Sequence, residues 1–330
     1  MENTKRKESF DMTTIPYKPY SERIPDRQYA NVLRFIRQSP ETFLAKNPHQ
    51  DAGRWTNLET PRMVFKFENG FPIITERKIP FWKTAITEII LFMQGVQTLD
   101  EMLASGCNWW ADWVSPEKCA NFGLKTGNLG PGSYGPILAK LPHFEWEKSA
   151  EFTGQGCYAP RPFNQVENLV QSLKDGPYLN GHVISTWFPP LDMQHGKLRR
   201  QVVVAPCHGT KIQATVIEGR KLALTMTQRS GDVPVGVVSN IIQYAALTIM
   251  LAHVCGYEPY KYIHVVDDAQ IYTNQVDRVD ELLEREPFPF PTLNLTDEGQ
   301  RISNIFDFTA DHFEISDYQS HPGMKIPTTL

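Results

Sequence analysis

The sequence lacks the features that define several common classes of protein. Its 330 residues include only five cysteines, at positions 107, 119, 157, 207 and 255, an odd number with no CxxC spacing. This argues against a disulfide framework and a zinc site, and it favours a reducing, cytoplasmic setting. The formal net charge is only −4. Bulk electrostatics therefore gives no reason to expect nucleic-acid binding, whereas a local arginine cluster for an anionic small molecule stays open.

Long apolar segments are also absent. The N-terminus starts with polar residues and has no apolar core of a signal peptide behind it. No uninterrupted apolar run approaches the length that spans a membrane. There is no GxGxxG pattern, so we do not predict a dinucleotide-binding fold. We expect a soluble protein with no membrane partner.

The pattern of apolar residues predicts one domain of the α+β class. Residues 1–25 are polar and dotted with proline, which predicts a flexible N-terminal arm, and no linker divides residues 26–330. The expected strands and helices do not alternate regularly, as they would in a βαβ fold. A nearly all-apolar helix at 240–255 should lie at the centre of the fold.

Periodicity predicts the other elements and their limits. We expect further helices at 26–37, 83–95, 98–106, 166–173 and 274–286. Residues 54–60 read as a polar loop. We expect strands at 63–67, 182–187, 201–205, 211–217, 222–228 and 262–266.

The first candidate for chemistry is the stretch Ala-Pro-Cys-His-Gly at 205–209. Cys207 follows a strand-like apolar run, where it could act as a nucleophile, but a lone buried cysteine is most often an inert small hydrophobe. His208 is its neighbour, yet adjacent strand residues point to opposite faces. We therefore do not expect His208 to deprotonate Cys207 directly, and spacing leaves catalysis and packing both open.

Other polar groups gain chemical meaning only if folding brings them to Cys207. An arginine such as Arg229 would lower the pKa of the thiol, and with Ser230 it suits a phosphate or carboxylate. Glu88 lies within an apolar helix, where a buried carboxylate is costly unless it is paired; a solvent-facing position is the alternative. Asn240 suits the amide edge of a pyrimidine, or simply the N-cap of a helix.

A long motif follows about twenty residues after Cys207. Residues 228–240 read QRSGDVPVGVVSN, which resembles the QRSxDxxLGxPFN signature of the thymidylate synthase family. The resemblance extends from about residue 54 to the C-terminus. It is supported by NGFPIIT at 69–75, Glu88 before Gln94-Gly95, Trp110 with Trp113, LGP at 129–131, Tyr134-Gly135, DAQIYTN at 268–274 and HPGMK at 321–325. It implies a single domain with a large, twisted mixed sheet and a central buried helix, forming a homodimer through the sheet.

The resemblance also implies a reaction, the transfer of a one-carbon unit from 5,10-methylenetetrahydrofolate to C5 of a uracil nucleotide, without a metal. Cys207 would add to C6, and C5 would attack the methylene group of the folate. Water held by Glu88 and Tyr134 would take the C5 proton. Hydride from the same folate would then reduce the exocyclic methylene to methyl as Cys207 leaves. Arg229 and Asn240 complete the implied catalytic set.

Binding residues follow from the same resemblance. Asn240 would read uracil rather than cytosine, and Tyr272 would bond the sugar 3′-hydroxyl. The residues implied for the nucleotide are Arg54, Arg229, Ser230, Asp232, Asn240, Gln270, Tyr272 and His208. Those implied for the folate are Lys78, Trp110, Asp232, Gly236 and the terminal Leu330, whose segment would close over the site and exclude water.

The sequence departs from the family pattern in four places. Asn180-Gly181 stands where the family has two arginines that reach the phosphate bound by the partner subunit. Arg199, Arg200 or Arg54 would have to compensate. The other departures are Gln270 for a histidine, Ala111 for an acidic residue, and Val238-Ser239 for proline and phenylalanine.

The departures surround the reacting groups and leave Cys207, Glu88, Asp232 and Asn240 in place. Three functions therefore stay open. Methylation is favoured by Trp110, which would shield the intermediate. Hydroxymethylation would follow if water instead of hydride added to the methylene group. A non-catalytic, nucleotide-binding relative is the third.

Overall fold

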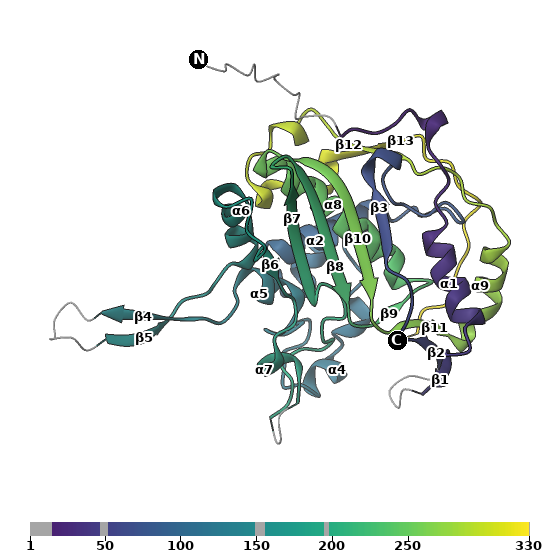
Figure 1. The fold of residues 1–330 in the computed structure, drawn as a ribbon. Helices are drawn as coiled ribbons and strands as arrows, with labels where there is room; N and C mark the ends of the chain where they lie inside the picture. The colour runs from purple at the N-terminus through teal and green to yellow at the C-terminus, as the bar shows by residue number, and fades with distance from the viewer. Residues whose placement is uncertain (1–14, 47–51, 149–155, 195–197, 330) are drawn as a thin grey trace, which may run out of the picture.

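A twisted mixed sheet forms the frame of the protein in the computed structural model, which describes residues 15–46, 52–148, 156–194 and 198–329 (Figure 1). In spatial order its described strands are β3 (Met63–Lys66), β10 (Glu258–Val266), β8 (Lys221–Gln228), β7 (Lys211–Ile217) and β6 (Val183–Ile184). Strands β8 and β10 are parallel, and the other neighbouring pairs are antiparallel. The carboxyl ends of β8 and β10, at Gln228 and Val266, therefore meet at one edge of the sheet.

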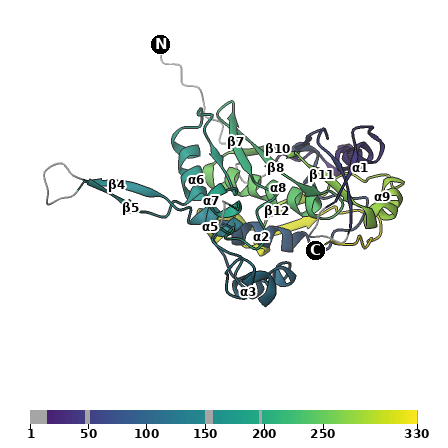
Figure 2. The same cartoon turned by 90° about the horizontal axis from the view of Figure 1, so that it is seen from below.

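A second, smaller sheet begins at that edge. Its described strands are, in order, β1 (Phe43–Ala45), β2 (Arg54–Asn57), β11 (Ala269–Tyr272) and β9 (Gly231–Asp232). Because β9 follows β8 closely and β11 follows β10, the chain carries both parallel strands from the main sheet into the smaller one. Two hairpins complete the β structure. They are β12 (Thr292–Leu295) with β13 (Phe313–Ser316), and β4 (Phe144–Lys148) with β5 (Gly156–Pro160), which projects from the body (Figure 2).

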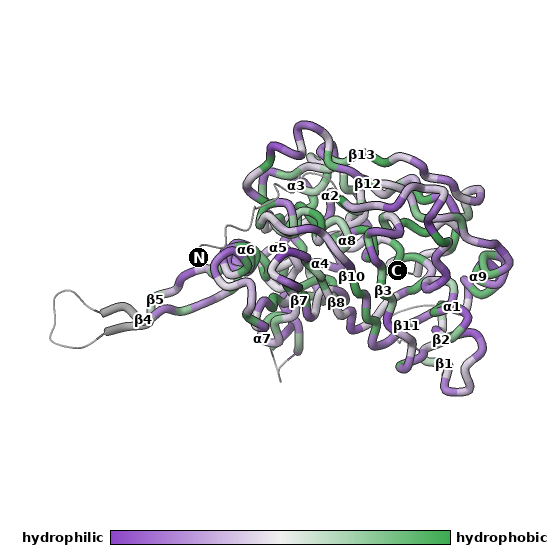
Figure 3. The backbone as a smooth tube through the Cα atoms, turned by 45° about the horizontal axis from the view of Figure 1, so that its top comes forward, coloured by the Kyte–Doolittle hydropathy of each residue, from purple (hydrophilic) through white to green (hydrophobic). Residues whose placement is uncertain are grey.

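The helix α8 (Gly236–Cys255) packs against one face of the main sheet, and α2 (Trp82–Met93) packs against α8 (Figures 1 and 2). Sixteen of the 20 residues of α8 are buried, including the polar Asn240, Gln243 and Thr248. By length and composition alone α8 is apolar enough to cross a membrane, but 89% of its most apolar window is buried inside the protein. The hydrophobic segments gather around α8 and the neighbouring strands (Figure 3).

The remaining helices lie around these layers. They are α1 (Gln28–Gln38), α3 (Leu99–Ala104), α4 (Pro116–Ala120), α5 (Tyr134–Ala139), α6 (Gln165–Asp175), α7 (Pro189–Asp192) and α9 (Val276–Leu283). The α+β class and the single domain are as predicted. Short 3-10 turns occupy Tyr20–Glu22, Phe67–Asn69, Ala111–Trp113, Thr273–Gln275, Gly299–Arg301, Ile305–Asp307 and Ala310–His312.

Three of the expected element assignments are wrong. The run 201–205 is largely buried but forms no strand, because its backbone bonds to a loop; Val203 N–H, for example, donates to Leu129 O at 3.1 Å. The expected loop at 54–60 starts with a strand, β2, which pairs with β1 and β11. The helix expected to begin at Asn240 begins four residues earlier, at Gly236. Two elements are shorter than expected, since β6 covers only Val183–Ile184 and α9 only Val276–Leu283.

The predicted arm, residues 1–25, lies in large part outside the described residues. Its described end packs near β12. The hydroxyl of Tyr17 donates to Leu293 O at 2.8 Å, and the buried Arg23 donates to Phe290 O at 2.9 Å and to Thr292 Oγ1 at 2.7 Å.

Candidate active site

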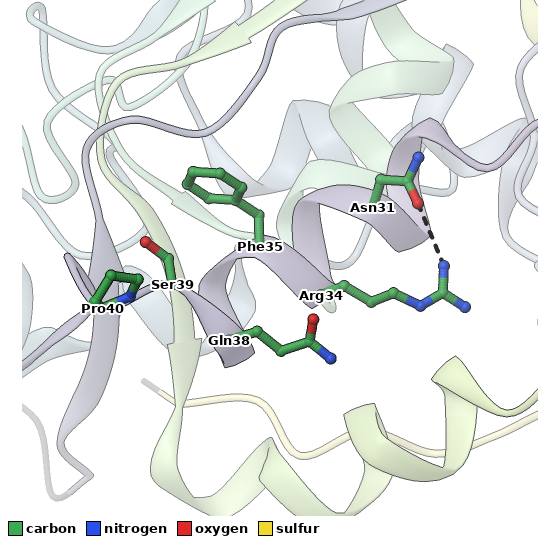
Figure 4. A pocket seen from close by; sticks show the side chains of 6 residues that line it. All are labelled: Asn31, Arg34, Phe35, Gln38, Ser39 and Pro40. Atoms are coloured by element: carbon green, nitrogen blue, oxygen red, sulfur yellow. Dashed lines mark hydrogen bonds between the residues drawn. The ribbon is translucent and has the colours of Figure 1, made fainter.

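A cavity of about 670 Å³ lies where β8 ends and α8 begins, walled on its other sides by α2 and the tryptophan-rich loop at 108–113. Most of the residues singled out from the sequence meet there, although they come from separate parts of the chain. The ones that line the cavity are Glu88, Trp110, Tyr134, Cys207, His208, Ser230, Asp232, Gly236, Asn240, Gln270 and Tyr272. A smaller surface pocket of about 370 Å³ along α1 includes none of them (Figure 4).

Four of the singled-out residues do not line the cavity. Arg229, beside the lining residue Ser230, is exposed, and so is Lys78 in the segment before α2. Arg54 lies on β2, opposite Tyr272 of β11. Leu330 lies outside the described residues, but Thr328 and Thr329 just before it reach the cavity.

Cys207 is held in place through its backbone as well as its side chain. Its N–H donates to Tyr134 Oη at 2.8 Å, and its carbonyl accepts from Arg229 N–H at 2.9 Å. Its Sγ lies 3.4 Å from the same Tyr134 Oη. The loop can turn behind Cys207 because Gly209 adopts a φ of 71°, where a Cβ would lie 2.3 Å from Tyr244 Oη. The thiol is thus fixed at the cavity wall.

The guanidinium of Arg229 donates hydrogen bonds to the backbone of this loop. It donates to Ala205 O at 3.1 Å and to Pro206 O at 2.9 Å, and it lies over the ring of Trp187. As predicted, its charge acts to lower the pKa of the Cys207 thiol. Burial has the larger effect, however, and the net pKa of Cys207 is raised. The thiol is therefore mainly protonated in the protein without substrate.

His208 is a neutral packing partner. Burial, with a smaller contribution from His264, lowers the pKa of His208 to about 3. Its ring stacks on Tyr134 with centroids 4.3 Å apart, and its Nδ1 lies 2.9 Å from Tyr244 Oη. These contacts agree with the expectation that His208 does not act as the base for Cys207.

Glu88 is a buried acid whose carboxyl group accepts two hydrogen bonds. Trp110 Nε1 donates to its Oε1 at 2.6 Å, and Gln243 Nε2 donates to its Oε2. Burial raises the pKa of Glu88 to about 7, while these two hydrogen bonds act in the opposite direction. The solvent-facing alternative for Glu88 is wrong, because only 6% of the residue is exposed. A carboxyl group with a pKa near neutrality suits proton transfer.

Asn240 faces the same cavity from the second turn of α8, so it is not an N-cap. Gln228 Nε2 donates to its Oδ1 at 3.0 Å, and its own Nδ2 donates to Gln243 Oε1 at 3.0 Å. Sequence reasoning missed Gln243. The available signal was its polarity within an apolar helix, three residues after Asn240 and therefore on the same face.

Asp232 connects the cavity to the C-terminal segment. Gln275 Nε2 donates to Asp232 Oδ2 at 3.0 Å and to Pro327 O at 2.9 Å. Burial raises the pKa of Asp232 to about 7. Gln275, fully buried and also missed from the sequence, thus fixes the tail beside Asp232.

The position of the missing arginine pair is exposed. Asn180 and Gly181 lie between α6 and β6, and Asn180 O accepts from Gln213 Nε2 at 3.4 Å. Burial lowers the pKa of Arg200, and the nearby charge of Arg229 lowers it further. Arg199 instead donates to Asn121 O at 2.9 Å. Of the substitutes considered from the sequence, Arg200 is thus the one placed beside Arg229.

The chain matches a known family over nearly its whole length. The model of the thymidylate synthase family covers residues 27–330, which include every element that lines the cavity. Members of that family are methyl or hydroxymethyl transferases that use methylenetetrahydrofolate as co-substrate. Among the described residues no group of three His, Cys, Asp or Glu side chains is arranged to hold a metal ion. From the extent of this match, the chain belongs to the thymidylate synthase family.

Proposed function

We propose that the protein converts dUMP to dTMP by transferring a one-carbon unit from 5,10-methylenetetrahydrofolate to C5 of the uracil ring. The observation that carries the proposal is the meeting of Cys207, Glu88 and Asn240 in one cavity. They supply a nucleophile, a proton-transfer group and a reader of the pyrimidine edge. The family match supplies the reaction class.

The first step is addition of the Cys207 sulfur to C6 of the base. The thiol must lose its proton when the nucleotide binds or reacts, because burial keeps the thiol protonated in the protein without substrate. Arg229 favours the thiolate by its charge, and Tyr134 Oη favours it by hydrogen bonding. Addition at C6 makes C5 an enolate-like carbon nucleophile, which attacks the methylene group of the folate.

The second step removes the proton from C5. Glu88 is the group for this transfer, acting through water between itself and Tyr134, because its pKa of about 7 lets it accept and return a proton near neutrality. Elimination of the folate leaves an exocyclic methylene group on C5. Hydride from the folate reduces this group to methyl, the bond between sulfur and C6 breaks, and dihydrofolate leaves.

Exclusion of water decides between methyl and hydroxymethyl products. The tail residues Thr328 and Thr329 lie against the cavity, and Gln275 holds Pro327 beside Asp232. A covered site protects the exocyclic methylene group from water and so favours hydride transfer.

Hydroxymethylation is the second candidate, and Ser239 favours it. This residue, directly before Asn240, lines the cavity with a hydroxyl group that could hold a water molecule. Water would then add to the methylene group, and the folate would leave as tetrahydrofolate instead of dihydrofolate.

The proposed function is tested by release of tritium from [5-³H]dUMP in the presence of methylenetetrahydrofolate. Wild-type protein should release tritium, and Cys207→Ala should release none. Equal release by both proteins would contradict the role of Cys207. Absence of release by wild-type protein that still binds dUMP would favour a non-catalytic relative.

The family resemblance also leads us to propose a twofold homodimer that forms through the main sheet. One face of this sheet is covered by α8. The opposite face presents half-exposed residues that alternate with buried ones, among them Thr225 and Thr227 on β8 and Ile263 and Val265 on β10. A face of this kind, partly apolar and without charge at these positions, suits packing against a second copy.

A further inference from the structure

A continuous chain of buried side chains joins the cavity to the interior of the main sheet. Every member is at most 6% exposed. The links are Tyr262 Oη to His264 Nδ1 at 2.8 Å, His264 Nε2 to Gln228 Oε1 at 3.0 Å, Gln228 Nε2 to Asn240 Oδ1 at 3.0 Å, Asn240 Nδ2 to Gln243 Oε1 at 3.0 Å, and Gln243 Nε2 to Glu88 Oε2.

All donors in this chain point toward Glu88. Above its pKa of about 7 the Glu88 carboxyl is ionised and can only accept, so Gln243 must then present its amide nitrogen to Glu88 and its oxygen to Asn240. Asn240 then turns its nitrogen toward Gln243 and its oxygen toward Gln228. The same logic gives Gln228 an oxygen for His264 Nε2–H, which leaves His264 Nδ1 to accept from Tyr262.

The ionised Glu88 carboxylate is the one member of this hydrogen-bonded series that cannot be reversed. An amide can rotate by half a turn, a neutral imidazole can exchange tautomers, and a phenol hydroxyl can rotate. Burial lowers the pKa of His264 to about 3, so its ring is neutral and has this freedom. Without the connection to Glu88, the four polar groups from Tyr262 to Asn240 could therefore point in either direction with every bond still made.

We propose that Gln243 is a positioning residue that fixes the orientation of the Asn240 amide by joining it to Glu88, and that it thereby sets which pyrimidine the site accepts. This inference rests on the proposed function only in taking a pyrimidine as the ligand. Gln243 lies behind Asn240 and outside the cavity lining, so it acts through Asn240.

Amide orientation selects the base because the two pyrimidines present opposite patterns. Once Asn240 has bonded to Gln228 and Gln243, its amide keeps one N–H and one acceptor site for a ligand. Uracil offers an acceptor at O4 beside a donor at N3, whereas cytosine offers a donor at N4 beside an acceptor at N3. One fixed orientation of the amide matches one of these edges and opposes the other.

The decisive variant is Gln243→Met, which keeps the length of the side chain but cannot connect Asn240 to Glu88. Calorimetry with dUMP and dCMP at about pH 8.5, where Glu88 is mainly ionised, should show the preference for the uracil nucleotide falling by at least about tenfold, as expected when one buried hydrogen bond is lost. Gln165→Met is the matched control, because Gln165 is also a buried, fully bonded glutamine but has no contact with Glu88 or Asn240. It should keep the wild-type preference.

A second variant separates positioning from a general loss of packing. In Gln243→Glu the new carboxyl can still accept from Asn240 Nδ2, so the preference for dUMP should be retained. It also places an acid against Glu88, and two adjacent carboxyls share a proton. The pH at which the Glu88 carboxyl titrates should therefore move upward, as followed by infrared difference spectroscopy with Glu88→Gln to assign the band.

Few ionisable groups near Glu88 change their protonation state in the pH range in which Glu88 titrates. The ionisable groups that face it are Cys107, Cys207 and Tyr244, all with raised pKa values and therefore neutral around pH 7. Asp232, on another wall of the cavity, titrates in the same range. The Glu88→Gln variant distinguishes the infrared band of Asp232 from that of Glu88, because only the Glu88 band is lost.

The outcomes distinguish this inference from the proposed function. Folded Gln243→Met protein that keeps the full preference for dUMP overturns the inference, as does Gln243→Glu protein that loses it. Wild-type protein that binds dUMP over dCMP but releases no tritium contradicts the proposed function alone. Wild-type protein that does not distinguish the two nucleotides contradicts the inference whatever the enzyme activity.

Discussion

At the scale of single residues, the environment of Glu88 bears most directly on the proposed proton transfer. A carboxyl group that is ordinarily ionised at neutral pH is enclosed by α2, α8 and the loop that carries Trp110. Its two donors, Trp110 and Gln243, only partly offset the loss of water, so the pKa remains raised to about 7. The same burial that suits proton transfer must therefore reduce stability whenever Glu88 is ionised.

The sign of this effect on stability follows from proton binding. From about pH 4.5 to 7 the folded protein keeps the Glu88 proton and the unfolded chain has lost it, so folding stability falls as the pH rises. Between about pH 5 and 8 the free energy of unfolding should therefore decline less in Glu88→Gln than in the wild-type protein, by on the order of 3 kcal/mol. Urea unfolding at the two pH values measures this. If stability fell equally with pH in the two proteins, the raised pKa of the buried Glu88 carboxyl would be contradicted.

At the scale of elements, the site depends on how β8, the 205–209 loop and α8 meet. The loop can make its turn because Gly209 has a positive φ and no side chain to meet Tyr244. Tyr244 in turn supports His208, whose ring stacks on Tyr134, the partner of Cys207. The nucleophile is therefore positioned by packing that starts from one glycine.

Gly209→Ala tests this packing. The added Cβ would lie 2.3 Å from Tyr244 Oη, so we expect it to destabilise the protein by more than about 2 kcal/mol and to lower turnover. Gly106→Ala is the control, because Gly106 has a similar φ of 78° with nothing within 4 Å of a new Cβ. It should cost about 1 kcal/mol, the backbone contribution alone, as followed by thermal unfolding. Equal losses in the two variants would count against the contact with Tyr244.

Elements with clear periodicity were predictable, and those defined by tertiary contacts were not. The strand at 211–217 was found with its limits because apolar and polar residues alternate there. The run 201–205 is just as apolar, but it packs against the loop near Leu129 instead of a strand. Cys207, Glu88 and Asn240 were found through their motifs. Gln243 was not, because no local pattern reports its bond to Glu88, 155 positions away.

At the scale of the whole molecule, the main sheet has one face packed on α8 and one open face. The open face on β8 and β10 carries side chains that are apolar or weakly polar and only half-buried, including Ile263 and Val265. Covering this face with a second copy would complete the layer that α8 forms on the other side. The arrangement is the basis of the proposed homodimer.

Val265→Lys tests the dimer. A lysine on the open face, near the carboxyl end of β10, would place a charge in the interface, which is strongly unfavourable without a partner. Sedimentation should show a dimer for wild-type protein and a monomer for the variant. As a control, Thr87→Lys changes a partly exposed position on α2, which packs on α8 away from the open face, and should leave the dimer intact. A wild-type monomer, or a variant that still dimerises, would argue against the sheet face as the interface.

The most direct test of the proposed reaction is the identity of the products formed from dUMP and methylenetetrahydrofolate. Mass spectrometry of the nucleotide and the absorbance of dihydrofolate are measured together, with Cys207→Ala as the control. We expect a nucleotide that has gained one methyl group in place of hydrogen, an equal amount of dihydrofolate, and neither product from the control. A hydroxymethyl nucleotide with tetrahydrofolate, or no change in the nucleotide, would contradict the proposed reaction.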